Sequence, residues 1–322
     1  MPQQLYAAID VGGTKIAAAL VDAEGTLLTR AELPTPPSGS GEQVMATVAR
    51  LVDTLALDPR WPDAVGVGIG SAGPVDPARG TVSPVNIPGW RDFPLVDRVR
   101  ELDAVSGEVV LVGDGSAMAA GEHWRGAARG YDNALCLVVS TGVGAGLILD
   151  GALRTGPSGN AGHLGHICVD VEGEQCPCGS RGCLEIIASG TSIARWAVHN
   201  GWRTRSDNVV ETTSDTEVKV TAADIAESAR SGNEIALAAF ERAGRALAAG
   251  IASAAMLVDI RAAVVGGGVA KAGPLLFDPL RRHLATYASL PFTHDLAILP
   301  ATLGGDAGLI GAAAALARPA TG

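Results

Sequence analysis

Leu5-Tyr-Ala-Ala-Ile-Asp-Val-Gly-Gly-Thr-Lys15 is an apolar stretch that runs directly into a turn with two adjacent glycines. An apolar run bounded by such a turn predicts a short buried strand over Leu5–Asp10. We expect the next two strands at Ala17–Val21 and Thr26–Arg30, joined by the turn Ala23-Glu24-Gly25. The chain thus opens with strand, glycine-rich turn, strand, turn and strand.

The same order of strands and turns returns roughly 130 residues later. Ala134–Val139 is again an apolar strand, and it ends in the turn Ser140-Thr-Gly-Val-Gly-Ala-Gly146. The strand Leu147–Leu149 and the turn Asp150-Gly151 follow it. Such a repeat favours an α/β protein with two related lobes that face one another.

Hydrophobic periodicity gives the remaining elements. Strands are predicted at Ala64–Ile69, Val109–Val112 and Ala262–Val265, helices at Glu42–Leu57, Ser116–Trp124, Ala222–Ser231, Glu234–Val258 and Ala307–Ala317, and an exposed polar loop at 204–219.

Length, charge and cysteine spacing narrow the class of protein. At 322 residues the chain is long enough for two lobes, and its net charge of −10 argues against a nucleic-acid partner. Met1–Asp10 lacks the features of a secretion signal, and no apolar run is long enough to span a membrane. Three of the five cysteines lie close together, which is typical of a metal site in a reducing compartment. We therefore expect a cytoplasmic protein.

The first glycine-rich turn has the chemistry of a phosphate-binding loop. Gly12 and Gly13 let backbone N–H groups approach a phosphate, Thr14 adds a hydroxyl, and Lys15 adds a positive charge. Asp10 is placed to hold Mg²⁺ through water, because Mg²⁺ prefers carboxylate oxygens and keeps much of its hydration shell. By itself the turn also fits a plain hairpin, and its spacing differs from that of a Walker loop.

Two further glycine-rich turns would complete a nucleotide site. Ser140–Gly146 offers the same chemistry, with Thr141, Gly142 and Gly144 as candidate contacts for a second phosphate. A strand rather than a helix follows it, which disfavours a Rossmann dinucleotide site. Gly267 and Gly268 follow the strand Ala262–Val265 and would let an adenine and its ribose lie against the backbone, although a triple glycine also fits a loose loop.

A cluster of cysteines predicts a zinc site. Cys176, Cys178 and Cys183 are close enough in the chain to bind one ion, and His166 is a candidate fourth ligand. Cys168 could compete as a ligand, and three buried thiols without a metal are the alternative. A closed site with four protein ligands is structural, so zinc would shape the loop around it.

Asp114 directly follows a predicted strand and precedes a predicted helix. A carboxylate at such a strand end can accept the proton of a hydroxyl that attacks a phosphate. Its position also suits an N-cap of the helix that follows. The residues alone leave both roles open.

The order of these motifs resembles that of the actin-like superfamily of sugar kinases and Hsp70 ATPases. Asp-x-Gly-Gly-Thr-Lys, Ser-Thr-Gly-x-Gly-x-Gly and Val-Gly-Gly-Gly carry this resemblance. Within the superfamily the chain resembles the ROK family, named after repressors, open reading frames and kinases. The resemblance runs from Asp10 to the helix after Gly304-Gly305-Asp306, and Gly162–His166 and Cys176–Glu185 are its most specific parts.

The resemblance implies a fold, an activity and an oligomeric state. The fold would be a two-lobed actin-like ATPase of the ribonuclease H type, with a small lobe of residues 1–114 plus 303–322 and a large lobe of residues 115–302. The large lobe would carry the zinc loop 163–185. The activity would be ATP-dependent, with Mg²⁺, and would phosphorylate the 6-hydroxyl of glucose or of a related hexose or amino sugar. A homodimer is typical of the family.

The resemblance also assigns roles to individual residues. Asp114 would be the general base rather than a cap. Asn86, His163, His166 and Glu185 would bind the sugar, since such groups can pair with hydroxyls. The family pattern uses His166, Cys176, Cys178 and Cys183 as zinc ligands, and therefore not Cys168.

Two positions depart from the family pattern, and both fall in the expected sugar pocket. Gly113 stands where ROK glucokinases have asparagine, and His163 stands where they have glutamate. Such losses can shift specificity strongly, and the missing side chain at Gly113 opens space for a substituent such as an N-acetyl group. These changes keep open a sugar sensor with weak catalysis. A DNA-binding repressor is disfavoured, because no helix-turn-helix domain fits ahead of Asp10.

Overall fold

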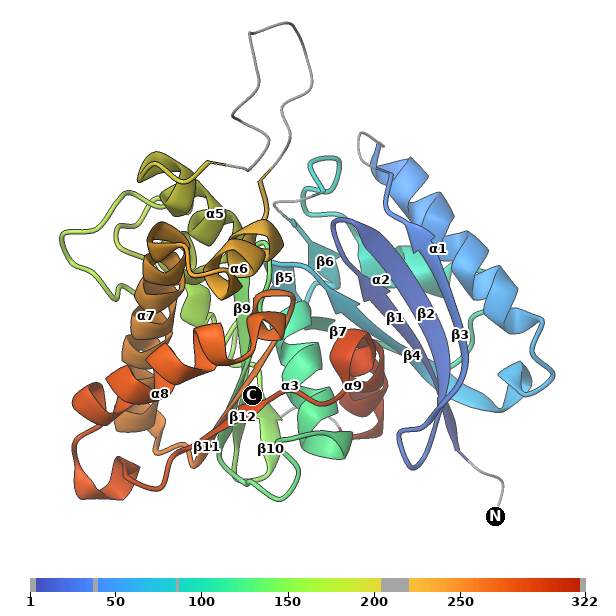
Figure 1. Cartoon of the computed structure of the whole chain (residues 1–322). Helices are drawn as coiled ribbons and strands as arrows, with labels where there is room; N and C mark the ends of the chain where they lie inside the picture. Colours follow the sequence, from blue (N-terminus) through green and yellow to red (C-terminus); the bar gives the residue numbers. More distant parts are fainter. Residues whose placement is uncertain (1–3, 37–39, 85–86, 204–219, 319–322) are drawn as a thin grey trace, which may run out of the picture.

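The protein is built on two five-stranded mixed sheets with helices on both faces (Figure 1). It is a computed structural model that describes residues 4–36, 40–84, 87–203 and 220–318. Asn86 and the loop expected at 204–219 lie outside the described residues.

The two sheets have the same plan. The first has the order β3-β2-β1-β4-β7 and the second the order β10-β9-β8-β11-β12. The strands are β1 (Leu5–Val11), β2 (Lys15–Asp22), β3 (Leu27–Pro34), β4 (Ala64–Ser71), β7 (Glu108–Gly113), β8 (Ala134–Val139), β9 (Val143–Leu149), β10 (Ala152–Arg154), β11 (Ala262–Gly266) and β12 (Ala297–Pro300). The first strand of each sheet pairs antiparallel with the next strand in sequence and parallel with its other neighbour. The predicted repeat is therefore confirmed.

The helices form three layers around the sheets (Figure 1). The outer face of the first sheet packs on α1 (Gly41–Ala56) and α2 (Leu95–Arg100), and α3 (Asp114–Arg125) and α9 (Ala307–Ala317) lie between the sheets. The outer face of the second sheet packs on α4 (Glu185–Ala188), α5 (Gly190–His199), α6 (Ala222–Arg230), α7 (Glu234–Val258) and α8 (Pro274–Tyr287). A two-stranded ribbon of β5 (Val75–Asp76) and β6 (Thr81–Val82) forms a separate small sheet that packs on the outer core of the first sheet.

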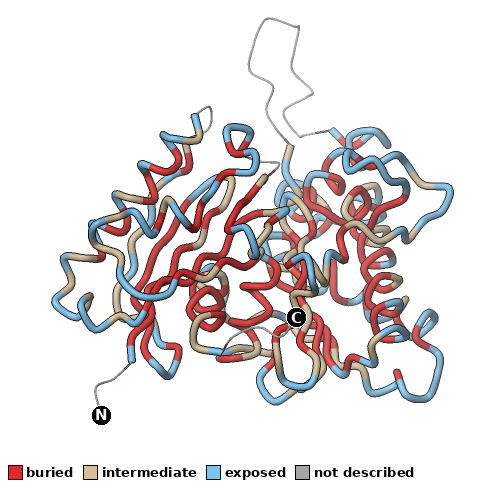
Figure 2. The backbone as a smooth tube through the Cα atoms, turned by 180° about the vertical axis from the view of Figure 1, so that it is seen from behind, coloured by how far each residue is buried: buried red, intermediate tan, exposed pale blue. Residues whose placement is uncertain are grey.

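Each sheet buries both faces, as the red strands in Figure 2 show. In β1, Ile9 and Val11 enter the outer core with α1, whereas Tyr6 and Ala8 face the layer of α3 and α9. This alternation follows from the two-residue period of a strand. The central strands such as β1 therefore read as continuous apolar runs in the sequence, whereas the edge strand β3 has no buried residue and carries charged side chains.

In the layer between the sheets, α3, α9 and β4 pack so closely that their backbones are in contact. A side chain at Gly68 of β4 would overlap the Ala312 carbonyl of α9. Gly311 of α9 lies in the same way against the Ala117 backbone of α3. The small residues of the predicted helix Ala307–Ala317 thus let it fit between a sheet and a second helix.

Local sequence explains where several helices begin. Ser40 and Gln43 form a capping box at the start of α1, and the Asn233 side chain accepts a hydrogen bond from the Ala236 N–H at the start of α7.

The predicted helices Glu234–Val258 and Ala307–Ala317 are confirmed with the same bounds, as α7 and α9. Two strands are four residues longer than predicted at one end. β3 continues to Pro34 rather than Arg30, and β9 begins at Val143 rather than Leu147, where Gly146 pairs with Cys136 and its bare Cα lies against Gly115 and Ser116.

Glu122 is a fully buried carboxylate on α3. It accepts hydrogen bonds from the N–H groups of Ala127 (2.7 Å), Thr302 (3.0 Å) and Leu303 (2.9 Å). These bonds tie α3 to the segment that connects β12 with α9.

Within the described residues, every helix is too short or too polar to cross a membrane.

Candidate active site

A small pocket lies beside the carboxyl end of β7 and the first turn of α3. Its walls include Gly73, Gly113, Asp114, Gly144, Asn160 and His163. Gly73 follows β4 and Gly113 ends β7, both strands of the first sheet, whereas Gly144 belongs to β9 of the second sheet. The fold therefore brings Asp114 and His163, both predicted site residues, into one pocket with residues from both sheets.

Asp114 is the first residue of α3, whose N-cap is Gly113, so the structure does not use Asp114 as the cap. Its Oδ1 accepts a hydrogen bond from the Gly115 N–H at 2.7 Å. Solvent reaches the carboxylate through the pocket, yet protein atoms surround it on most sides, and this burial raises its pKa. The Gly115 hydrogen bond and the charge of His163 oppose the rise in pKa, and the charge of Glu185 adds to it.

Asp10, near the end of β1, is a half-buried carboxyl that interacts with the charge of Asp114. Its side chain lies against Gly308 at the start of α9, where a Cβ would collide with the carboxylate. Burial, followed by the negative charge of Asp114, raises the pKa of Asp10 to about 6, although Lys15 and Arg30 oppose this. Neighbouring carboxylates of this kind suit a hard divalent cation such as Mg²⁺.

Hydrogen bonds from Thr35 fix the backbone of the first glycine-rich turn. Thr35 donates from its N–H to the Thr14 carbonyl (3.0 Å) and from its hydroxyl to the Gly12 carbonyl (2.7 Å). The ammonium of Lys15 pairs with Glu32 on the neighbouring strand at 2.9 Å. A phosphate contact of Lys15 stays a prediction, as do those of Gly12, Gly13 and Thr14.

The second glycine-rich turn is held by the segment around α4. The Glu185 carboxylate accepts the Val143 N–H at 2.8 Å, and the Thr191 hydroxyl donates to the Thr141 carbonyl at 3.0 Å. Glu185 therefore contacts the turn predicted to bind phosphate, a contact that the sequence did not indicate. A Cβ at Gly144 would lie 3.6 Å from Oδ1 of Asp114, so this turn also reaches the pocket.

The third glycine-rich turn lies beside the second. Gly267 has a φ of +88°, and a side chain there would overlap the Val139 backbone. The nearest heavy atom to a Cβ at Gly268 would be Oγ of Ser140. Two of the three turns predicted to bind a nucleotide thus meet at the carboxyl ends of β8 and β11.

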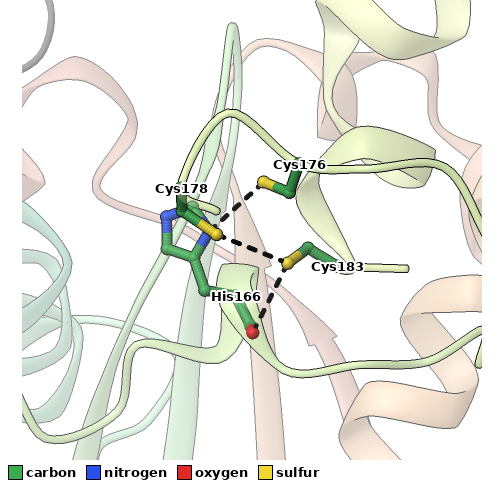
Figure 3. Close-up of side chains that lie close together, drawn as sticks. All are labelled: His166, Cys176, Cys178 and Cys183. Atoms are coloured by element: carbon green, nitrogen blue, oxygen red, sulfur yellow. Dashed lines mark hydrogen bonds between the residues drawn. The ribbon is translucent and has the colours of Figure 1, made fainter. Parts of the chain in front are cut away.

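Four predicted metal ligands converge at one point (Figure 3). The ligand atoms of His166, Cys176, Cys178 and Cys183 all lie within 4.8 Å of one another. Sγ of Cys176 is 3.8 Å from Nδ1 of His166, and the Cys178 and Cys183 sulfurs are 3.7 Å apart. Tetrahedral Zn–S bonds of about 2.3 Å place two sulfurs roughly 3.8 Å apart, so the cluster fits zinc. Cys168 is exposed and is not among the four.

His163 is joined to the zinc loop and to the first half of the chain. Its ring stacks on that of His166 with centroids 6.0 Å apart, and its Nδ1 lies 3.2 Å from the Asn160 carbonyl oxygen. The Asn160 amide donates to the Val75 carbonyl at 2.8 Å and accepts the Val75 N–H at 3.3 Å. Sequence reasoning missed Asn160, because an asparagine beside Gly159 is typical of a turn.

Comparison with known proteins places the chain among sugar kinases and their relatives. The family model described as "ROK family" matches residues 6–319. The chain is 34% identical over 315 residues to a glucokinase of Thermotoga maritima, covering 97% of both chains. It is 34% identical over 307 residues to an N-acetylmannosamine kinase of Yersinia pseudotuberculosis, covering 95% of this chain and 96% of the relative.

A solved structure agrees with these relatives. The ROK family glucokinase of Streptomyces griseus, crystallised with glucose and AMPPNP, is 36% identical and superimposes with a TM-score of 0.78. The match covers 96% of this chain and 98% of that one. Sequence and fold thus agree over nearly the whole length, and the chain belongs to the ROK family.

Proposed function

We propose that the protein is an ATP-dependent sugar kinase that transfers the γ-phosphoryl group to a hydroxyl of a hexose, with Asp114 as general base. The position of Asp114 carries the proposal, since its carboxyl lies in a pocket beside Gly144 of the second glycine-rich turn. Proton acceptor and phosphate loop are therefore neighbours. The glucokinases and the N-acetylmannosamine kinase among the relatives support a sugar as acceptor.

Asp114 would accept the proton of the attacking hydroxyl as its oxygen bonds to phosphorus. Burial raises the pKa of Asp114, which makes the ionised carboxylate a stronger base. Because phosphoryl transfer depends mainly on positioning and charge, the glycine-rich turns would hold the phosphates in line with the hydroxyl. Mg²⁺ held by Asp10 through water would neutralise charge on the phosphates.

The sugar would be bound by Asn86, His163, His166 and Glu185. A zinc ion on His166 and the three cysteines would fix the loop that carries His163 and ends at Glu185. The phosphorylated group is proposed to be the 6-hydroxyl.

The proposal includes a division into lobes and an assembly. The lobes are residues 1–114 with 303–322, and residues 115–302. All strands of the first sheet precede residue 114, and α9 packs back on β1 and β4, which supports this division. We also propose that the protein is cytoplasmic and that it forms a homodimer.

An ATP-coupled assay over a panel of hexoses and amino sugars, with an Asp114→Asn variant, tests the function. Wild type is expected to phosphorylate at least one sugar. The kcat of the variant should fall by about 10²–10⁴-fold, because the amide cannot accept the proton of the hydroxyl. The variant should still bind that sugar. Asp53→Asn, on an exposed face of α1, is the matched control. If no sugar is phosphorylated but one raises the melting temperature, the protein is a sugar sensor and the kinase proposal fails.

A further inference from the structure

The Asn160 side chain joins the two proposed lobes by pairing with a strand edge. Its Oδ1 accepts the Val75 N–H at 3.3 Å, and its Nδ2 donates to the Val75 carbonyl at 2.8 Å. One amide thus pairs with both backbone groups of one residue, as a neighbouring strand would. Val75 lies in β5 of the first lobe, whereas Asn160 follows β10 of the second.

The backbone of Val75 is available for this contact because the rest of its ribbon is paired elsewhere. Val82, which faces Val75 across the ribbon, exchanges both of its backbone hydrogen bonds with Phe93, at 3.0 Å each. The bond between the two strands runs beside this pair, from the Ser83 N–H to the Pro74 carbonyl. A residue at such a position directs its own N–H and C=O away from the partner strand. The amide therefore covers an otherwise open strand edge.

The segment that carries Asn160 also contacts both lobes through its backbone. A Cβ at Gly165 would overlap the Val143 carbonyl of β9, so the segment lies directly on the second sheet. A Cβ at Gly159 would overlap the ring of Pro77, the residue that follows β5. The segment can therefore reach the first lobe only because residue 159 has no side chain.

His163 takes its place in the pocket from the same segment. Its Nδ1 lies 3.2 Å from the Asn160 carbonyl oxygen, and a Cβ at Gly73 of the first lobe would lie 3.9 Å from its Cε1. His163 is exposed, so these contacts and its ring stack on His166 fix its position rather than burial in a core. Because Asp114 lines the same pocket, Asn160 sets how His163 faces Asp114.

We propose that Asn160 is a positioning residue that holds the two lobes in the arrangement that binds the sugar, with His163 opposite Asp114. The inference rests on the proposed function for the identity of the ligand. Without the amide, fewer molecules have this arrangement, and the apparent dissociation constant is the intrinsic one divided by that fraction. The affinity for sugar therefore falls, whereas turnover at saturating sugar stays nearly the same.

Asn160→Ala, assayed with a sugar that wild type phosphorylates, tests the proposal. We expect KM for the sugar to rise by about 10-fold, since each of the two lost hydrogen bonds changes an equilibrium constant by roughly 2–10-fold. The kcat should change by less than about 3-fold. Asn160→Gln keeps the amide on a longer stem and should recover part of the affinity. Calorimetric binding of the same sugar without ATP gives a readout that does not depend on turnover.

Asn133→Ala is the matched control for a general loss of stability. The Asn133 side chain also accepts from one backbone N–H and donates to one backbone carbonyl, but its partners, Asp150 and Asp259, lie in its own lobe. This variant should lower the melting temperature and leave KM for the sugar unchanged.

A second variant disturbs the same contact without removing the amide. Gly159→Ala pushes the segment away from Pro77 and should also raise KM for the sugar. Gly232 has a similar left-handed backbone, with φ +85° against +80° at Gly159, and a Cβ there would meet no atom within 4 Å. Gly232→Ala should therefore introduce the same backbone strain and leave KM unchanged. Zinc content checks that the loop after Gly159 is intact.

Amide hydrogen exchange gives a readout without any ligand. The Val75 N–H should exchange about 10-fold faster in Asn160→Ala than in wild type, because the separated arrangement leaves it open to solvent. The amides of β1 lie inside the first sheet and should exchange at the wild-type rate in both proteins.

The outcomes separate the two proposals. An active wild type and a folded Asn160→Ala variant with unchanged KM and unchanged sugar affinity overturn the role of Asn160 and leave the kinase in place. A fall in kcat at unchanged KM would overturn it as well. If wild type binds a sugar without phosphorylating any, and the variant binds that sugar more weakly, the kinase fails and the inference stands. Unchanged exchange of the Val75 amide overturns the inference whatever the sugar results.

Discussion

Replacing Asp10 by asparagine is expected to stabilise the folded protein at neutral pH while it abolishes phosphoryl transfer. Burial and the charge of Asp114 raise the pKa of Asp10 from 3.8 to about 6. Between these values the folded state binds more protons than the unfolded state, so stability falls as the pH rises through this window. Well above pH 6, as at pH 8, the whole penalty of the buried charge is present.

The size of the effect follows from the difference in pKa. About 6 minus 3.8 is roughly 2 units, and each unit corresponds to about 1.4 kcal/mol, which gives about 3 kcal/mol at pH 8. At pH 5 the same two pKa values leave about half of this penalty. Asparagine has nearly the same shape and no charge, so it should recover about 2–3 kcal/mol at pH 8. Activity should be lost because an amide is a poor ligand for Mg²⁺.

Urea unfolding of wild type and Asp10→Asn, at pH 5 and pH 8 without added Mg²⁺, measures the prediction. Asp53→Asn makes the same change at an exposed position and should alter stability by less than about 0.5 kcal/mol at either pH. A loss of stability in Asp10→Asn at pH 8 would refute the reasoning. A gain of equal size at both pH values would show that the charge of Asp10 is not its source.

Two further variants test buried contacts that lie away from the pocket. Glu122→Ala should lower the free energy of unfolding by about 3–5 kcal/mol, because the N–H groups of Thr302 and Leu303 lose their buried acceptor; a loss below about 1 kcal/mol in urea unfolding would contradict this. Cys178→Ser should remove zinc from the purified protein, as measured by elemental analysis, and lower the melting temperature. Cys168→Ser should do neither, and equal zinc loss in both variants would exclude the proposed four-ligand set.

Features that depend on neighbours in the chain could be predicted from the sequence. The strands beside the glycine-rich turns are apolar runs with clear ends, and the zinc ligands from His166 to Cys183 lie in one short segment. Asp114 could be placed at a strand end because Val109–Val112 is a distinct apolar run. In each case the signal is local, so no knowledge of packing was required.

Contacts between distant segments could not be predicted. Asn160 bonds Val75 across 85 residues, and Glu122 bonds Thr302 across 180 residues. The pairing of Lys15 with Glu32 depends on the register of two strands, which periodicity alone does not reveal. The predicted sugar contact of Asn86 lies outside the described residues.

The close approach of Gly68 to α9, and of α9 to α3, has a consequence for how the chain tolerates sequence change. A larger residue at Gly68 or Gly311 has no free volume to enter and must push two backbones apart, whereas the exposed face of α1 can direct longer side chains into solvent. Substitutions on the solvent-exposed face of α1 are therefore expected to cost less stability than substitutions in the layer between the sheets. Asp10 lies against Gly308 of α9 and Asp114 is the first residue of α3, so a substitution that pushes α9 away from α3 or β4 would also change the distance between the two carboxylates.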